Sequence, residues 1–365
     1  MADYKFNRTV RLDYHEVLAW QTEMYVAVGM SPTDANTSAH HLVIADARGV
    51  YSHGIMRTPT YIEKMRLGGL NPTARPEIIR GKGPTIVVDG HNAMGQVAAS
   101  FGTEKAIELA REFGSSTVSI TGSNHLGTCA YYTEQAAAAD MVGFCWTINA
   151  NNIMAPWGGI DARLGNNPFG ISAPCLTRPP VTLDMATSVV ARGKIAMAMK
   201  TGTQIPSNWA LDKFGNPTTD PEAAFHGTVQ PSGEYKGYGL TFMNAIVSAI
   251  LNGSAFGEDV GDFFENPTQV QNTGHLLQFI DISAIDDVTA FKQRMDNAVT
   301  YLKAANRREG VDEIFVPGEM EARSFARQTE QGIDYPLEVI QELAQLGTTL
   351  GVSTRPEWTA EVAVR

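Results

Sequence analysis

The apolar positions in the first third of the chain repeat at helical spacing. Val17, Met24 and Val28 fall on one face of a predicted helix that Asp13 and Glu16 cap. Ser31-Pro32 predicts the start of the next helix, because proline suits the first helical turn. The predicted helices in this part cover about 13–28, 31–48, 56–68 and 96–113.

From Ser116 onward, short apolar runs alternate with longer amphipathic segments. The runs predict strands and the longer segments predict helices. We expect strands at 85–89, 118–121, 142–148, 181–184, 276–282 and 313–316, and helices at 129–140, 192–200, 236–252, 288–305, 319–331 and 336–346. Residues 149–174 are rich in Gly, Asn and Pro, and predict a long irregular loop of the kind that is usually functional.

This change of pattern predicts an α/β fold with two domains. We expect a helix-rich domain formed by residues 1–115 together with 285–365, and an α/β domain formed by residues 116–284 that is inserted into it. A chain of 365 residues is long enough for this arrangement.

One polar stretch, Ile44–Arg57, interrupts two apolar helices. Arg48 and Arg57 flank Ser52-His53 on a turn between Gly49 and Gly54. Arginine captures carboxylates in bidentate fashion, and histidine moves a proton near neutral pH. The stretch therefore predicts an anion site with an acid/base group. The alternative is structural: Arg48 pairs with Asp46 at the helix end, and His53 is a satisfied polar group in the core.

Two further stretches are candidates for the site. His125 lies in a glycine-bounded turn, 122–127, between a predicted strand and helix, where backbone N–H groups favour anions. Asp184 ends a predicted strand and could orient a histidine or accept a ribose hydroxyl. Each has a structural alternative, a plain tight turn for His125 and a helix cap for Asp184. Lys236 could touch a phosphate, although a lysine at a helix start is more often simply exposed.

Composition and missing motifs exclude several classes of protein. The 28 basic and 39 acidic residues leave a net charge of −11, which argues against nucleic acid or an anionic membrane as partner. Three separated cysteines fit a reducing, cytoplasmic setting, and no apolar window is long enough for a membrane span. No zinc motif, P-loop or G-x-G-x-x-G fingerprint occurs, so we expect no metal and no ordinary Rossmann site. A hydrolase built on Ser52, His53 and Asp184 is disfavoured, because adjacent side chains seldom pair as nucleophile and base.

Eight ordered motifs resemble those of the malate/L-lactate dehydrogenase family, which is distinct from the Rossmann-type lactate and malate dehydrogenases. The motifs read R-G-V-Y-S-H-G-I-M-R, G-S-N-H-L-G, N-x-x-x-P-W-G-G, G-N-N-P-F-G, D-M-A-T-S, W-A-L-D with N-P-T-T-D-P, K-G-Y-G-L and P-G-E, and the match as a whole runs from about Leu12 to Gly332. The family also includes ureidoglycolate and sulfolactate dehydrogenases, diketogulonate reductase and a cyclic imino acid reductase. No motif of the family covers the tail beyond Gly332.

The resemblance implies a homodimer with an unusual nicotinamide-binding fold that uses NAD or NADP. It implies hydride transfer at C2 of a small 2-hydroxy or 2-oxo acid, with His53 as proton donor and acceptor, Ser52 beside it, and Asp184 as possible charge partner. His125 remains a rival for the acid/base role. The remaining implied roles are substrate binding by Arg48 and Arg57, and cofactor binding by Asn149, Asp184, Met185, Ala186, Lys236, Gly318 and Glu319.

Two other functions stay open at this point. Reduction of the C=N bond of a cyclic imino acid would use the same residues. A protein of another class, one that binds small carboxylates without catalysis, would keep the pocket but show no reaction with nicotinamide.

Overall fold

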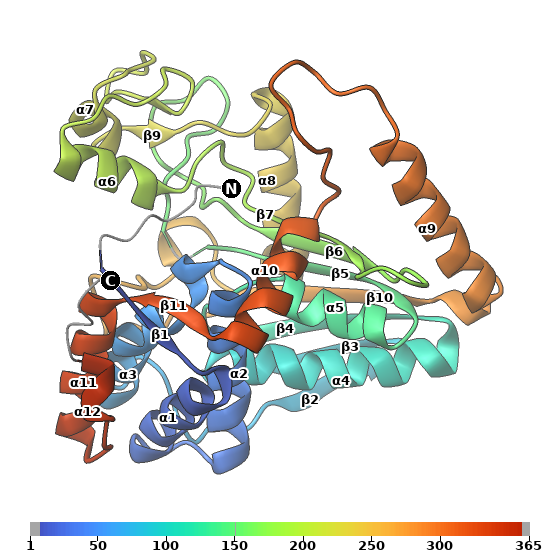
Figure 1. Cartoon of the computed structure of the whole chain (residues 1–365), viewed down its shortest axis with the longest axis horizontal. Coiled ribbons are helices and arrows are strands. Elements are labelled where there is room, and N and C mark those ends of the chain that lie inside the picture. The colour runs from blue at the N-terminus through green and yellow to red at the C-terminus, as the bar shows by residue number, and fades with distance from the viewer. Residues whose placement is uncertain (1–7, 150, 360–365) are drawn as a thin grey trace.

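A seven-stranded sheet forms the centre of the molecule in a computed structural model, which describes residues 8–149 and 151–359 (Figure 1). Its strands lie in the order β2-β3-β4-β10-β5-β6-β7, and every neighbouring pair is antiparallel except β3–β4. The strands are β2 (Glu77–Lys82), β3 (Thr85–Asp89), β4 (Ser115–Ser123), β5 (Met141–Thr147), β6 (Phe169–Ala173), β7 (Val181–Met185) and β10 (Thr273–Asp281). The expectation of an α/β fold without a Rossmann sheet is confirmed.

Two helices cover one face of this sheet. α4 (Gly95–Phe113) packs on β4 and β10, and α5 (Ala130–Ala138) packs on β5 and β6. Alanine and glycine let them approach closely: a Cβ on Gly143 of β5 would lie 2.6 Å from the Cβ of Ala136 in α5. α8 (Tyr235–Ser248) contacts β5 and β10 through a separate small cluster that contains Ile148, Ala245 and Ala249.

A second core lies among helices that come from both ends of the chain. α1 (Tyr14–Ala27), α2 (Pro32–Ala47), α3 (Thr58–Leu67) and α11 (Leu337–Leu350) share one apolar cluster. The strand β1 (Thr9–Leu12) pairs with β11 (Ile333–Pro336), so a strand from the start of the chain lies beside one from its last tenth (Figure 1). The tail beyond Gly332, to which no role was assigned, therefore completes this core.

The remaining elements connect these cores or extend from them. A small apolar cluster is formed by residues on or next to α6 (Arg192–Thr201), α7 (Pro221–Phe225), β8 (Ala210–Leu211) and β9 (Thr228–Val229). The others are α9 (Val288–Lys303), α10 (Glu319–Gln331), α12 (Pro356–Thr359) and the 3-10 turns Tyr51–His53, Ile55–Arg57, Ile250–Asn252, Gly257–Asp259 and Ile282–Ala284. None of the helices in the described part of the chain is long and apolar enough to cross a membrane.

The structure corrects the predicted elements in several places. The strand expected at 313–316 is wrong, because these residues are irregular and Glu313 forms ion pairs instead. β6 lies inside the segment 149–174, which was expected to be a loop, and Ala150 of that segment lies outside the described residues. β1, β2 and β11 were not predicted. The division into two domains stays a prediction; β2, β3 and α4 precede residue 116 and yet belong to the sheet and its cover.

Candidate active site

A tight double turn carries Ser52 and His53 between α2 and α3. Two 3-10 turns, Tyr51–His53 and Ile55–Arg57, meet at Gly54. The buried Asp46 side chain accepts a hydrogen bond from the Ile55 backbone N–H at 2.9 Å, and a Cβ on Gly54 would lie only 1.6 Å from Asp46 Oδ1. Glycine at 54 therefore lets the chain fold back over Asp46, and burial raises the pKa of Asp46 well above its usual range.

The two candidate histidines lie face to face. Their rings are 5.6 Å apart between centroids, with an interplanar angle of 25°. His53 Nδ1 lies 2.9 Å from Ser52 Oγ, and His125 Nδ1 lies 2.7 Å from Tyr61 Oη. Tyr61 Oη also accepts a hydrogen bond from Gln96 at 3.1 Å. The Tyr61 proton is thus directed to His125 Nδ1, which favours the tautomer with the proton on Nε2.

Both histidines are neutral near pH 7. Burial, and secondarily the positive charge of Arg57, lower the pKa of His53 to about 4. Burial and the neighbouring charges lower the pKa of His125 well below its usual range. A neutral imidazole accepts a proton from a hydroxyl group, and an anion bound beside His53 would raise its pKa again.

The two arginines occupy different places around the turn. Arg48, which is 9% exposed, donates to Glu134 Oε2 on α5 at 2.5 Å, so it does not form the alternative helix-end pair with Asp46. Arg57 donates to the Ser52 carbonyl at 2.7 Å, and its guanidinium lies 4.9 Å from the centroid of the Phe264 ring. Arg48 faces the cavity described below, whereas Arg57 supports the turn from behind Ser52.

The segment 262–270, which was not predicted to belong to the site, packs against His125 and Arg57. Phe263 packs against the His125 ring at a centroid distance of 4.9 Å, and Phe264 lies under Arg57. The completely buried Lys64 donates to the carbonyls of Asp262 at 3.1 Å and Gln269 at 2.8 Å, which ties the segment to α3. No motif marked these residues, because the contacts join positions about two hundred residues apart.

A cavity of about 440 Å³ connects the predicted site residues. The residues that line it and were predicted from the sequence are Arg48, His53, His125, Asn149, Asp184, Met185, Ala186 and Gly318. Four predicted residues do not line it. Ser52 contacts His53, Arg57 lies behind Ser52, Lys236 is exposed beside Tyr235, and Glu319 takes part in an ion-pair network.

Asp184 is the residue before the last one of the strand β7, and it lines the cavity. Its Oδ2 accepts a hydrogen bond from the Ala130 backbone N–H at 2.8 Å, at the start of α5. Asp184 therefore does cap a helix, but it caps α5 rather than the helix near Arg192 that the structural alternative named. Enclosure raises the pKa of Asp184 to about 6, while the helix N–H and Arg48 act in the opposite direction.

The cavity fits a nicotinamide group. Its volume is within the range of about 300–1,000 Å³ that is typical of small-molecule sites. Leu126, Ile148 and Leu183 supply apolar walls for a planar ring, and Asn149 and Asn166 supply amide groups for a carboxamide. No cluster of metal-ligating side chains occurs among the residues the structure describes.

Comparison with known proteins shows that the chain is an oxidoreductase. The sequence model of the family described as malate/L-lactate dehydrogenase matches residues 12–344. The chain belongs to this family, as its motifs predicted.

Known relatives extend the similarity over most of the chain. Malate/(S)-sulfolactate dehydrogenase of Methanothermus fervidus is 35% identical over 326 residues, covering 89% of this chain and 94% of the relative. (2R)-3-sulfolactate dehydrogenase (NADP(+)) of Chromohalobacter salexigens is 35% identical, covering 87% and 92%. Ureidoglycolate dehydrogenase (NAD(+)) of Escherichia coli O157:H7 is 34% identical, covering 86% and 89%.

Solved structures agree with this result. Sulfolactate dehydrogenase from Methanocaldococcus jannaschii superposes with a TM-score of 0.89 at 33% identity, covering 94% of this chain and 98% of that one. Δ1-piperideine-2-carboxylate reductase from Pseudomonas syringae pvar. tomato gives a TM-score of 0.80 at 27% identity, covering 93% and 100%. The expectation of an NAD(P)-dependent dehydrogenase of this family is thus confirmed.

Proposed function

We propose that this protein transfers a hydride between NAD or NADP and C2 of a small 2-hydroxy or 2-oxo acid of the malate or lactate type. The observation that carries the proposal is the neutral His53, which opens onto the cavity beside Arg48. The three dehydrogenases first named above act on such acids, according to their names, and two of the names give the cofactor, NADP(+) in one and NAD(+) in the other.

The chain's own residues bind the substrate and move the proton. When bound, the nicotinamide accepts or supplies the hydride. His53 Nδ1 is occupied by Ser52, so His53 Nε2 is the atom that takes the proton from the substrate hydroxyl in oxidation and returns it in reduction. Arg48, which lines the cavity, holds the substrate carboxylate, because a guanidinium binds a carboxylate in bidentate fashion. Arg57, the other predicted substrate ligand, does not line the cavity and acts on the site through the Ser52 carbonyl and through its charge beside His53. His125, fixed by Tyr61, remains the rival for the proton transfer.

The remaining predicted residues hold the cofactor in this proposal. Asn149, Asp184, Met185, Ala186 and Gly318 line the cavity and would contact the nicotinamide half. Lys236 is exposed at the start of α8, where it is available for a phosphate further from the reacting carbon.

A homodimer in the cytoplasm completes the proposal. Ile285, Tyr301 and Leu302, on and just before α9, are 76%, 80% and 55% exposed, and apolar groups this exposed favour a second subunit. The three cysteines are free and buried, as expected for a reducing compartment. Light scattering of the purified chain measures the oligomeric state directly.

A cyclic imino acid is the second candidate substrate. The likeness to a Δ1-piperideine-2-carboxylate reductase favours it, because such an imine carries a carboxylate beside a C=N bond. His53 would then donate its proton to nitrogen instead of oxygen. The non-catalytic alternative predicts carboxylate binding without any change in nicotinamide absorbance.

One assay separates these functions. NADH and NADPH are each mixed with a panel of small 2-oxo acids and one cyclic imine, and the loss of absorbance of the reduced nicotinamide is followed. We expect turnover with a 2-oxo acid. Turnover with the imine alone would favour the second candidate, and binding of carboxylates without turnover on any panel member would support the non-catalytic alternative.

A further inference from the structure

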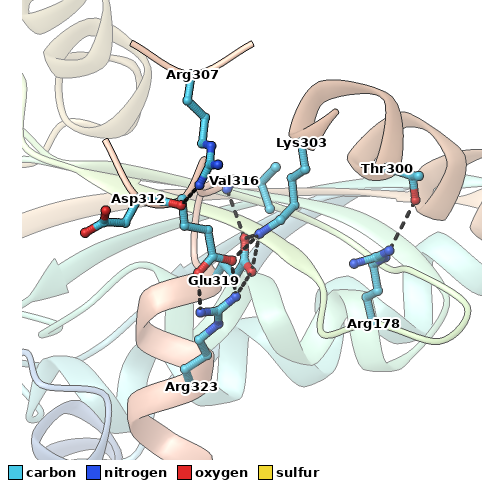
Figure 2. A network of polar contacts seen from close by, with 9 residues as sticks. Arg178, Thr300, Lys303, Arg307, Asp312, Val316, Glu319 and Arg323 are labelled. Carbon is cyan, nitrogen blue, oxygen red and sulfur yellow. Dashed lines mark hydrogen bonds and ion pairs between the residues drawn. The ribbon is translucent and has the colours of Figure 1, made fainter. Parts of the chain in front are cut away.

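An ion-pair network stands directly behind one wall of the cavity. Lys303, the last residue of α9, donates to Glu319 at 2.6 and 2.7 Å and to Glu313 at 2.9 Å. Arg323 of α10 donates to Glu319 at 2.6 Å and also binds Glu313. Figure 2 shows Lys303 and Arg323 converging on Glu319 from two different helices. Two cations and two carboxylates thus join α9, the segment 304–318 and α10.

Glu319 occupies the centre of this network. Its side chain is 18% exposed and that of Lys303 is 20% exposed, so solvent screens their attraction less than at an open surface. Glu319 also accepts a hydrogen bond from the Val316 backbone N–H at 3.2 Å. The same carboxylate therefore holds the segment that precedes α10 as well as the two basic side chains.

The residues on both sides of Glu319 line the cavity, although Glu319 does not. Pro317, Gly318 and Glu321 are part of the lining, and the Glu319 carboxylate is directed to Lys303 and Arg323. The Pro317 carbonyl accepts a hydrogen bond from the Thr182 N–H of β7 at 3.0 Å. Gly318 has φ +82°, and a Cβ there would lie 2.8 Å from the Thr182 carbonyl oxygen. The wall formed by Pro317-Gly318 thus fits closely against the strand that carries Asp184.

We propose that Glu319 is a positioning residue, which sets the cofactor wall at Pro317-Gly318 through Lys303 and Arg323 without touching the cofactor. The inference rests on the proposed function, since it assigns this wall to nicotinamide binding. It replaces the direct cofactor contact that the P-G-E motif implied for Glu319. Loss of the network frees the wall to move, so cofactor affinity falls while the chemistry at His53 continues.

Paired variants test the proposal. The dissociation constants of NADH and NADPH are measured by titration calorimetry for Glu319→Gln, Lys303→Met and the double variant. We expect each single variant to weaken binding by about tenfold, and the double variant to be no weaker than the single ones, because both remove one shared interaction. At saturating cofactor, kcat and the KM of the acid stay within about twofold of the parent. The conservative variant Lys303→Arg, which keeps the positive charge, should bind the cofactor as tightly as the parent.

An exposed ion pair elsewhere in the chain provides the control for these variants. Asp286→Asn breaks an exposed ion pair with Arg294 and should leave the dissociation constant unchanged. Arg323 also binds Glu319, so the deciding comparison removes both cations. A weaker Glu319→Gln beside unchanged affinity in the double variant Lys303→Met, Arg323→Met means that Glu319 contacts the cofactor itself, and overturns the proposal. Unchanged affinity in both single variants, or additive effects in the double variant Glu319→Gln, Lys303→Met, overturns it too. Failure of the parent chain to bind either nucleotide would overturn the proposed function with it.

Discussion

At the scale of single residues, His53 determines which direction of the reaction the resting site favours. Its imidazole is enclosed beside Arg57, and both effects disfavour the charged form. Burial and neighbouring charges also lower the pKa of His125 well below its usual range, so neither ring is protonated at neutral pH. The proton that reduction requires must therefore be taken up together with an anionic substrate.

Replacement of His53 tests this assignment. His53→Ala should lower kcat by about 10²- to 10⁴-fold, the usual contribution of general acid–base catalysis, while the dissociation constant of NADH stays close to that of the parent. His15→Ala on the exposed side of α1 is the matched control and should keep full activity. Near-normal turnover of His53→Ala combined with an inactive His125→Ala would transfer the role to His125.

The dependence of rate on pH provides a second residue-scale prediction. Because the pKa of His53 is about 4 in the free site, kcat/KM for oxidation should be constant from about pH 5 to 8. In the reductive direction kcat/KM should fall about tenfold per pH unit over the same range, since the protonated fraction falls at that rate. Initial rates in both directions measure this. A reductive profile that is flat between pH 5 and 8 would contradict it.

At the scale of elements, the double turn around Gly54 is the most constrained part of the site. Gly54→Ala should inactivate the enzyme and lower the free energy of unfolding by at least about 2 kcal/mol, because the new Cβ overlaps the Asp46 carboxylate. Gly193→Ala in the exposed first turn of α6 meets no atom within 4 Å and should be neutral or slightly stabilising. Urea unfolding and kcat of both variants provide the comparison. A fully active Gly54→Ala would show that the turn can relax.

The elements also show what sequence could and could not reveal. The helix starts at Asp13 and Ser31 were predicted correctly, because both signals are local caps, and β3 was predicted over its full length. β1 and β11 were missed because their pairing joins positions more than three hundred residues apart. The strand expected from Ile314, Phe315 and Val316 is absent because Phe315 lies between Lys303 and Arg323 rather than beside another strand. His53 and His125 could each be recognised in the sequence as candidate acid/base groups, but the stacking of their two rings could not be predicted from it.

At the scale of the whole molecule, buried histidines make the fold sensitive to acid. His41 and His275 are completely buried, and burial lowers the pKa of each to about 3. Below about pH 6.5 these two histidines are protonated in the unfolded chain but stay neutral in the folded protein. The free energy of unfolding therefore falls as pH falls. Asp184 acts in the opposite direction below about pH 6, because its folded pKa is raised. The raised pKa of the buried Asp46 has an effect of the same sign.

His275→Asn isolates one of these protons. Between pH 6 and 4.5 the free energy of unfolding of this variant should depend on pH less steeply than that of the parent, by about 1.4 kcal/mol per pH unit. Urea unfolding at several pH values measures both slopes, and His15→Asn serves as the exposed control. Identical slopes in the parent and His275→Asn would mean that His275 is protonated in the fold.

The pairing of β1 with β11 has a consequence for how the protein is made. The apolar core that supports α2, and with it the turn that presents His53, includes Ile333, Ile340 and Leu343. On a ribosome these residues are synthesised more than 250 residues after α2. The apolar faces of α1 to α3 therefore stay exposed while the strands of the central sheet, which come between α3 and β11 in the chain, are synthesised. A nascent chain stopped before residue 333 is therefore expected to require a chaperone, and the catalytic turn is among the last parts of the molecule to become ordered.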